Sequence, residues 1–179
     1  MRGNYAAFES DIRAGASEVY LHEMPGGQYT NLRQQARALG LEKRWPEVAL
    51  AYAQVNQLFG DIVKVTPSSK VVGDMALMMV SSGLTPDDVT DPDKDIAFPE
   101  SVVGFFRGEL GQPPGGLPPA LQAKVLKGET PISGRPGASM PPADLDALRK
   151  EAEHKAERHS SDDEFASYLM YPDVFTGYC

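Results

Sequence analysis

The sequence predicts a mainly α-helical fold with seven or eight helices and at most one or two short strands. Apolar residues recur at spacings of three and four through most of the chain, as in amphipathic helices. The 15 prolines and 17 glycines cluster between these periodic segments, at 25–27, 111–119 and 131–142, where they mark joints between helices. Strand and helix patterns do not alternate, so a complete doubly wound sheet or barrel is not expected from this chain.

The first third of the chain predicts three helices. Residues 3–14 place Tyr5, Phe8 and Ile12 on one helical face, and 18–24 form a short strand or an extended connector. The next helix opens near 28–31 and stops at Gly40. A further helix spans about 45–59 with an apolar side.

The middle of the chain begins with the apolar piece 62–65, whose β-branched residues favour a strand, although the preceding helix could also continue into it. Ser68 or Ser69 is then expected to cap a helix over 70–81, which Gly83 ends. The remaining predicted segments are a short helical turn from Thr85 and helices at 98–107, 118–126, 142–158 and from Ser160 or Ser161 through Leu169.

Composition excludes several classes of function. The net charge of −8 argues against a nucleic-acid or anionic-membrane surface, because both need clustered Lys and Arg. No apolar run approaches the roughly 20 residues of a membrane span. The only cysteine is Cys179, so no disulfide framework or cysteine metal site is expected. We expect a cytoplasmic protein.

The first candidate binding segment is the turn Pro25-Gly26-Gly27-Gln28-Tyr29-Thr30-Asn31. Gly26 and Gly27 let backbone amides come close to a partner. Gln28, Thr30 and Asn31 supply neutral donors and acceptors that suit an uncharged amide, ureido or carbonyl group. A capped loop whose polar groups satisfy one another is the alternative, with equal weight.

The second candidate segment is Thr66-Pro67-Ser68-Ser69-Lys70, at the start of a predicted helix. Here Lys70 stands beside the hydroxyls of Ser68 and Ser69, an arrangement that suits a carboxylate or another anion. A capped helix start is again the equally weighted alternative.

Other motifs predict neither a catalytic residue nor a metal site. His22, His154 and His159 have no metal-ligand spacing, and His22 is expected to have a structural or hydrogen-bonding role. The sequence has no Gly-x-Ser-x-Gly nucleophile motif and no Gly-rich phosphate loop with a following Lys-Ser/Thr.

Five motifs in order carry a family resemblance. The segments 22–32, 61–77, 98–103 (Phe-Pro-Glu-Ser-Val-Val), 111–116 (Gly-Gln-Pro-Pro-Gly-Gly) and 135–137 (Arg-Pro-Gly) together resemble the carboxyltransferase region of the pyruvate carboxylases. The resemblance covers nearly the whole chain, up to Tyr168-Leu-Met-Tyr-Pro172.

The resemblance implies a parent enzyme that uses biotin, ATP with Mg and a divalent metal in the carboxyltransferase barrel. It transfers a carboxyl group from carboxybiotin to pyruvate and yields oxaloacetate. This chain would be the helical extension after the (β/α)₈ barrel, with residues 1–130 forming a funnel at the active-site mouth. Residues 131–179 would form a Pro/Gly joint and two C-terminal helices. The resemblance places the turns 25–31 and 66–70 near the path of biotin, and we infer that the eight candidate residues above line this path.

The resemblance also implies that the metal ligands and the catalytic threonine belong to the barrel. The chain would then be an inactive fragment, without a bound cofactor of its own. Its partners would be the rest of the barrel and the biotin carboxyl carrier domain, in a homotetrameric parent. Two alternatives remain open at this point. One is an α-subunit fragment of oxaloacetate decarboxylase or transcarboxylase; the other is a non-catalytic helical module that binds a biotinyl carrier or partner subunit.

Overall fold

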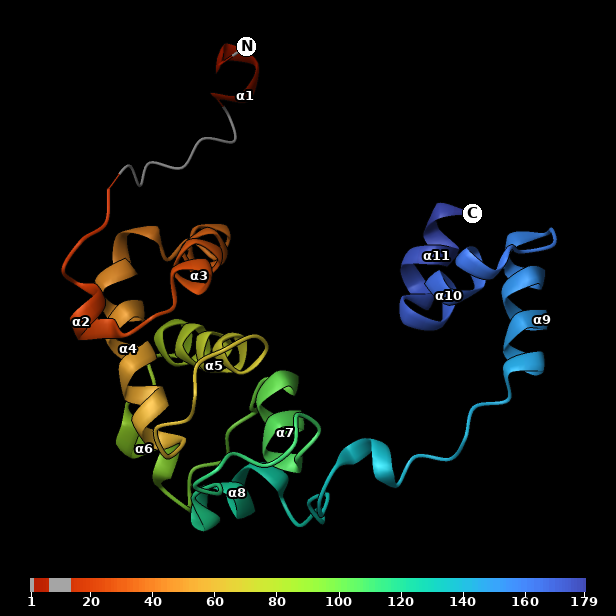
Figure 1. Cartoon of the computed structure of the whole chain (residues 1–179). Helices are drawn as coiled ribbons and strands as arrows, with labels where there is room; N and C mark the ends of the chain where they lie inside the picture. The colour runs from red at the N-terminus through yellow and green to blue at the C-terminus, as the bar shows by residue number, and fades with distance from the viewer. Residues whose placement is uncertain (1, 7–13) are drawn as a thin grey trace. The chain divides into compact units, whose positions relative to one another are not determined.

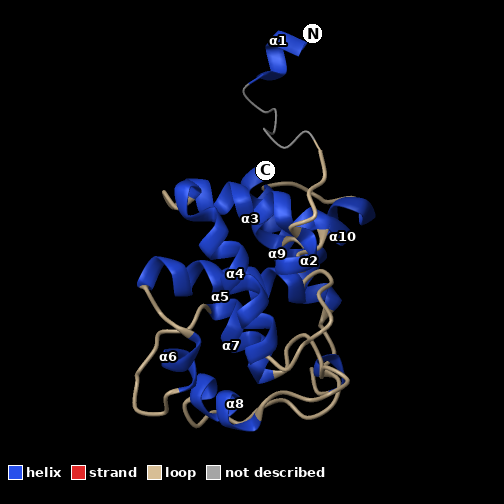
Figure 2. Ribbon diagram, turned by 90° about the vertical axis from the view of Figure 1, so that its left-hand side faces the viewer, coloured by secondary structure: helices blue, strands red, loops and turns tan. Residues whose placement is uncertain are grey.

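The computed structural model describes residues 2–6 and 14–179. These residues form eleven α-helices, eight of them with seven residues or more, and contain no strand (Figure 2). The prediction of a mainly α fold is therefore confirmed. None of the helices in the described part is long and apolar enough to cross a membrane.

The chain divides into two compact units, Met1–Ala138 and Ser139–Cys179. The helices of the first unit are α1 (Arg2–Tyr5), α2 (Val19–His22), α3 (Gly26–Ala38), α4 (Trp45–Leu58), α5 (Ser68–Ser82), α6 (Pro86–Thr90), α7 (Glu100–Arg107) and α8 (Pro119–Leu126) (Figure 1). Those of the second unit are α9 (Leu145–Ala156), α10 (Asp162–Met170) and α11 (Pro172–Tyr178).

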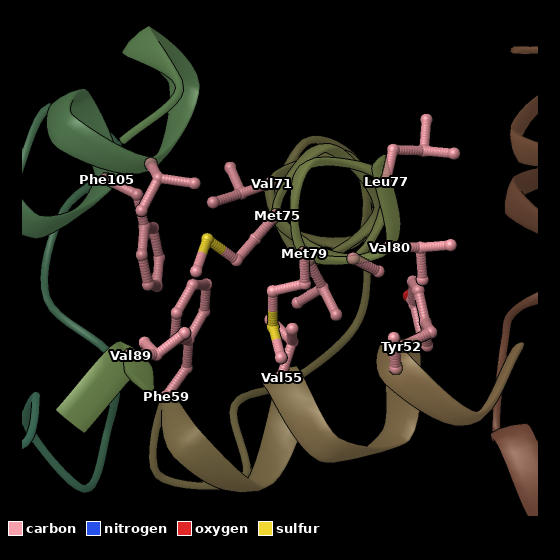
Figure 3. Close-up of a cluster of buried hydrophobic side chains, with 14 of the residues drawn as sticks. Tyr52, Val55, Phe59, Val71, Met75, Leu77, Met79, Val80, Val89 and Phe105 are labelled. Atoms are coloured by element: carbon pink, nitrogen blue, oxygen red, sulfur yellow. The ribbon is translucent and has the colours of Figure 1, made fainter. Parts of the chain in front are cut away.

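Helix α5 is the centre of the first unit, because it packs against α3, α4 and α7. Its side chains Met75 and Met79 are buried and point toward Phe59 and Val55 of α4, while the buried Val71 lies on the side of Phe105 of α7 (Figure 3). Each such side chain stabilises the fold by roughly 1.5–3 kcal/mol relative to full exposure. The apolar periodicity of 71–80 thus produces a helix that is buried on most sides.

An aromatic cluster connects α4 to α7. The Phe59 ring lies edge-on to the Phe106 ring, with centroids 5.0 Å apart, and stacks against Phe105 at 6.2 Å. Such pairs contribute about 0.5–1.5 kcal/mol beyond the area they bury. This cluster holds the C-terminal end of α4 against α7.

Two long basic side chains make hydrogen bonds to backbone carbonyls of elements that are distant in the sequence. Lys124 of α8 donates from Nζ to the carbonyls of Asp88, Val89 and Asp91, at 3.1, 2.8 and 2.5 Å. Arg44 donates from Nη1 to the carbonyl of Val80, near the end of α5, at 3.0 Å. Asp88 and Val89 lie in the last turn of α6, where carbonyls lack partners within the helix, so Lys124 satisfies groups that would otherwise need water. The carbonyls of Val80 and Asp91 also accept from the backbone amides of Gly83 and Lys94, so there the basic side chain is a second donor.

The second unit has its own small apolar cluster, formed by Ala152, Phe165, Tyr168 and Phe175. A capping box starts α10, because the Ser161 hydroxyl accepts from the Glu164 amide and the Glu164 carboxylate accepts from the Ser161 amide. The Arg149 guanidinium lies 4.3 Å from the Phe165 ring centroid.

Several local predictions were wrong. Residues 18–24 contain the helix α2 instead of a strand or an extended connector, and 62–65 form neither a strand nor a continuation of α4. Ser68 and Ser69 lie inside α5, and Pro67 occupies the cap position. Helix α11 was not predicted. The predicted helix at 3–14 falls largely on 7–13, outside the described residues.

These errors have local causes. Val63 and Val65 are 61% and 58% exposed, so no packing surface stabilises them as a strand. In α11, Pro172 occupies the first turn, where its missing amide costs nothing, and Phe175 is buried against the cluster. Burial of one side chain thus selects a helix that the sequence pattern leaves weak.

Candidate binding site between α3 and α5

The first candidate segment forms the start of α3. Pro25 is in an extended conformation (φ −58°, ψ 144°) and the helix begins directly at Gly26. A Cβ atom at Gly26 or Gly27 would meet nothing within 4 Å, so this end of the helix is open. The Thr30 hydroxyl donates to the carbonyl of Gly27 at 3.0 Å, which commits its proton to the helix backbone.

The second segment forms the first turn of α5, where Ser68 has a structural role. Its hydroxyl oxygen lies 2.6 Å from the carbonyl of Val63 and 2.7 Å from that of Val65, and it accepts from the Val65 amide at 3.2 Å. These contacts hold the preceding loop against the helix. The Ser68 hydroxyl is therefore not free for a ligand.

A polar cavity of about 390 Å³ lies between the two segments. It brings together four of the eight predicted site residues, Gln28 and Asn31 from α3 with Ser69 and Lys70 from α5. Three further residues line it, namely Gln34, Gln35 and Thr66. The cavity thus presents amides and hydroxyls next to a single ammonium group.

The other four predicted residues do not line this cavity. Gly26 and Thr30 face a second cavity of about 560 Å³, which His22, Met24 and Tyr29 also line. Ser68 faces the loop described above, and Gly27 lines neither cavity. The structure therefore divides the first segment between two sides of α3.

The ammonium of Lys70 is held by a network from two helices. Lys70 Nζ lies 2.5 Å from Asp74 Oδ2, one helical turn further along α5. The same oxygen accepts from the Ser101 hydroxyl of α7 at 2.6 Å. Asp74 thus holds the cation at the cavity, and Ser101 holds Asp74.

Ser69 lines the cavity although the residue is only 5% exposed. Its backbone carbonyl accepts a hydrogen bond from the Tyr52 hydroxyl at 3.4 Å, and burial raises the pKa of Tyr52 to about 12. The backbone amide of Ser69 donates to the carbonyl of Val65 at 2.9 Å, so the backbone of Ser69 takes the structural hydrogen bonds that the hydroxyl makes in Ser68. Ser69 is therefore the better of the two serines for contacting a ligand.

His22 belongs to the second cavity and is buried. Its Nδ1 accepts from the Met24 amide at 2.9 Å, and its ring centroid lies 5.2 Å from that of Tyr29. Burial lowers the pKa of His22, and the nearby Glu18 partly opposes this effect. Burial therefore favours the neutral ring, whose bond to the Met24 amide orders the segment that leads into α3.

The side chains that could ligate a metal are dispersed in the described part of the chain. Among residues 2–6 and 14–179, no three His, Cys, Asp or Glu side chains come together in a way that could hold an ion. No chemical step is therefore assigned to a metal held by these residues.

Sequence reasoning missed the residues that support the site. The i,i+4 spacing of Lys70 and Asp74 was a visible signal for an ion pair. Gln35 follows Gln28 by seven residues and so lies on the same helical face. Ser101 lies in the motif 98–103, but no sequence signal linked it to Asp74, because only the packing of α7 on α5 brings the two together.

Comparison with known proteins gives a consistent result. Residues 19–179 match the family described as the conserved carboxylase domain. The chain is 50% identical over 178 residues to the pyruvate carboxylase of Bacillus subtilis, covering 99% of this chain and 16% of that protein. It is 47% identical over 176 residues to human mitochondrial pyruvate carboxylase, covering 97% of this chain and 15% of that protein.

Solved structures agree. The carboxyl transferase domain of Rhizobium etli pyruvate carboxylase, solved with pyruvate and biocytin, is 68% identical with a TM-score of 0.94, over 99% of this chain and 30% of that one. The complete multifunctional pyruvate carboxylase of Rhizobium etli has a TM-score of 0.93, with 17% of its chain covered. This chain belongs to the conserved carboxylase domain family and corresponds to part of the carboxyltransferase region of pyruvate carboxylase.

Proposed function

We propose that this chain supplies the α3–α5 cavity to the path of biotin in a pyruvate carboxylase, which transfers a carboxyl group from carboxybiotin to pyruvate and forms oxaloacetate. The observation that carries the proposal is the composition of the cavity. Gln28, Asn31 and Ser69 offer neutral hydrogen-bonding groups beside the single ammonium of Lys70.

This donor set suits the chemistry of biotin. The ureido ring has one carbonyl and two N–H groups, and a side-chain amide can both donate to the carbonyl and accept from an N–H. Carboxylation adds a negative charge, which an ammonium stabilises by a charge-assisted hydrogen bond. The biocytin of the Rhizobium etli structure supports the choice of a biotinyl ligand.

The chemical step itself is proposed to lie in the rest of the parent protein. The chain spans 16% of its Bacillus subtilis relative, and its described residues assemble no metal ligand set. The proposed parent is a cytoplasmic homotetramer that uses biotin, a divalent metal and ATP with Mg. In it, this chain contacts the remaining carboxyltransferase barrel and the biotin carboxyl carrier domain. The chain alone is expected to be inactive.

The test compares two lysine variants in the complete enzyme. Lys70→Met removes the cavity cation, and Lys127→Met removes a cation that pairs with Asp95 away from the cavity. We expect Lys70→Met to lower kcat/KM for pyruvate carboxylation roughly tenfold, the effect of losing about one charge-assisted hydrogen bond. Lys127→Met should leave it unchanged.

Equal activity of the two variants would contradict a role of the cavity. A second assay addresses the inactive chain. The isolated chain is mixed with carboxybiotin, pyruvate and a divalent metal, and oxaloacetate is measured. Metal-dependent turnover by the chain alone would show that the catalytic groups are not confined to the rest of the parent.

A further inference from the structure

The surface of α5 lacks a side chain at Gly73, which leaves a gap at the position that faces the Gln28 side chain. A Cβ atom built at Gly73 would overlap Nε2 of Gln28 and would lie 2.9 Å from Cδ1 of Leu32. Real Cβ atoms do not approach other heavy atoms so closely. Because Gly73 has no side chain, α3 and the Gln28 amide can approach the backbone of α5 closely.

Gln28 stands between this gap and the polar cavity. One side of its side chain rests on Gly73, and the same side chain lines the cavity with Asn31, Ser69 and Lys70. We propose that Gly73 is a positioning residue of the cavity, because it sets where the Gln28 amide lies and hence how wide the cavity is. That this position matters for a biotinyl ligand rests on the proposed function.

The surroundings decide which group would move if the gap were filled. Leu32 is fully buried in the core, so its methyl group has no space into which to retreat. Gln28 is only half-buried and has the cavity beside it. A methyl group at Gly73 would thus displace the Gln28 amide into the cavity and narrow it.

The test is a double-mutant cycle with Gly73→Ala and Gln28→Ala. In the complete carboxyl transferase domain, each single change should weaken biocytin binding roughly three- to tenfold, about the effect of one neutral hydrogen bond. Gly73→Ala should add nothing in the Gln28→Ala background, because no amide remains to be displaced. Equal losses in both backgrounds would overturn the proposal.

A second readout does not depend on binding. The Gln28 side-chain amide signals are followed by NMR in the 179-residue chain. They should shift in Gly73→Ala and stay in place in Gly177→Ala, a helix glycine with nothing near its missing Cβ. Unmoved Gln28 signals in Gly73→Ala would refute the positioning role.

The two readouts separate the two ideas. Shifted Gln28 signals with unchanged biocytin affinity would uphold the role of Gly73 and reject the cavity as a biotinyl site. A melting curve accompanies each variant, because the Leu32 contact predicts a lower Tm for Gly73→Ala in both backgrounds. Loss of affinity is counted only at temperatures where the variant domain is folded.

Discussion

The backbone amide of Met24 donates a hydrogen bond to Nδ1 of His22, and the two atoms are 2.9 Å apart. Because Nδ1 must be unprotonated to accept, this bond ties the order of the chain before α3 to the protonation state of one buried imidazole. A histidine without any metal-ligand spacing can therefore still affect the stability of the fold.

This bond predicts a pH dependence of stability. Burial lowers the folded pKa of His22 below its ordinary value of 6.5, so the unfolded chain takes up the proton first as pH falls. The stabilisation is complete above about pH 6.5 and decreases below it. We expect Tm to fall by roughly 2–4 °C on this account between pH 8 and 5, as for a loss of about 1 kcal/mol.

The matched variant is His22→Asn, which keeps an acceptor but does not titrate. Its Tm should change less between pH 8 and 5 than that of the original protein. Identical pH profiles for the two proteins would mean that His22 is not the titrating group.

Lys124 predicts a stability effect that depends on its three backbone carbonyls. In Lys124→Met, the carbonyls of Asp88, Val89 and Asp91 lose the hydrogen bond from the ammonium, and only Asp91 keeps a backbone donor, the amide of Lys94. The free energy of unfolding should fall by about 1–3 kcal/mol, measured by urea denaturation. Lys127→Met is the control, because its partner Asp95 is 88% exposed and such surface pairs contribute about 0–1 kcal/mol. Similar losses in both variants would contradict this role of Lys124.

Ser68 and Ser69 are expected to respond differently to the same change. Ser68→Ala removes the contacts that hold Val63 and Val65, so the free energy of unfolding should fall by about 1 kcal/mol. Ser69→Ala should change stability less and should weaken biocytin binding by the complete domain. The reverse assignment, with binding lost in Ser68→Ala alone, would show that the structural and ligand-facing serines have been exchanged.

The second unit should be sensitive to acid through Glu164. Its pKa is lowered to about 2, chiefly by the Arg158 guanidinium, and next by the Ser161 amide of the capping box. A lowered carboxylate pKa stabilises the fold above the unfolded value of about 4.5, and this stability is lost as pH falls toward 2. We expect the Ser161 amide to lose protection from hydrogen exchange over this range.

Glu164→Gln is the control for this effect. It removes the titrating group and the charge that pairs with Arg158. The protection of its Ser161 amide from hydrogen exchange should be lower at pH 6 than in the original protein. This protection should change little between pH 4.5 and 2. A steep acid response in this variant would assign the effect to another carboxylate.

Much of the helical pattern could be predicted from the sequence, because its signals are local. Gly83 ends α5 with φ 66°, and the Thr85–Asp88 capping box starts α6, both as their residue types predict. The wrong assignments lie where no such local signal decides. Helix α2 and the loop 62–65 are short apolar pieces, and short apolar pieces are ambiguous between helix and strand.

The sequence by itself determined that the chain is helical, that it contains two polar turns at helix starts, and that these turns resemble those of the pyruvate carboxylases. The structure showed that α3 begins at Gly26, so that the helical repeat of 3.6 residues places Gln28, Asn31 and Gln35 on one face and Gly26 and Thr30 on another. Only the tertiary structure decided which face meets α5. That choice depends on long-range packing, which the gap at Gly73 and the buried Leu32 permit.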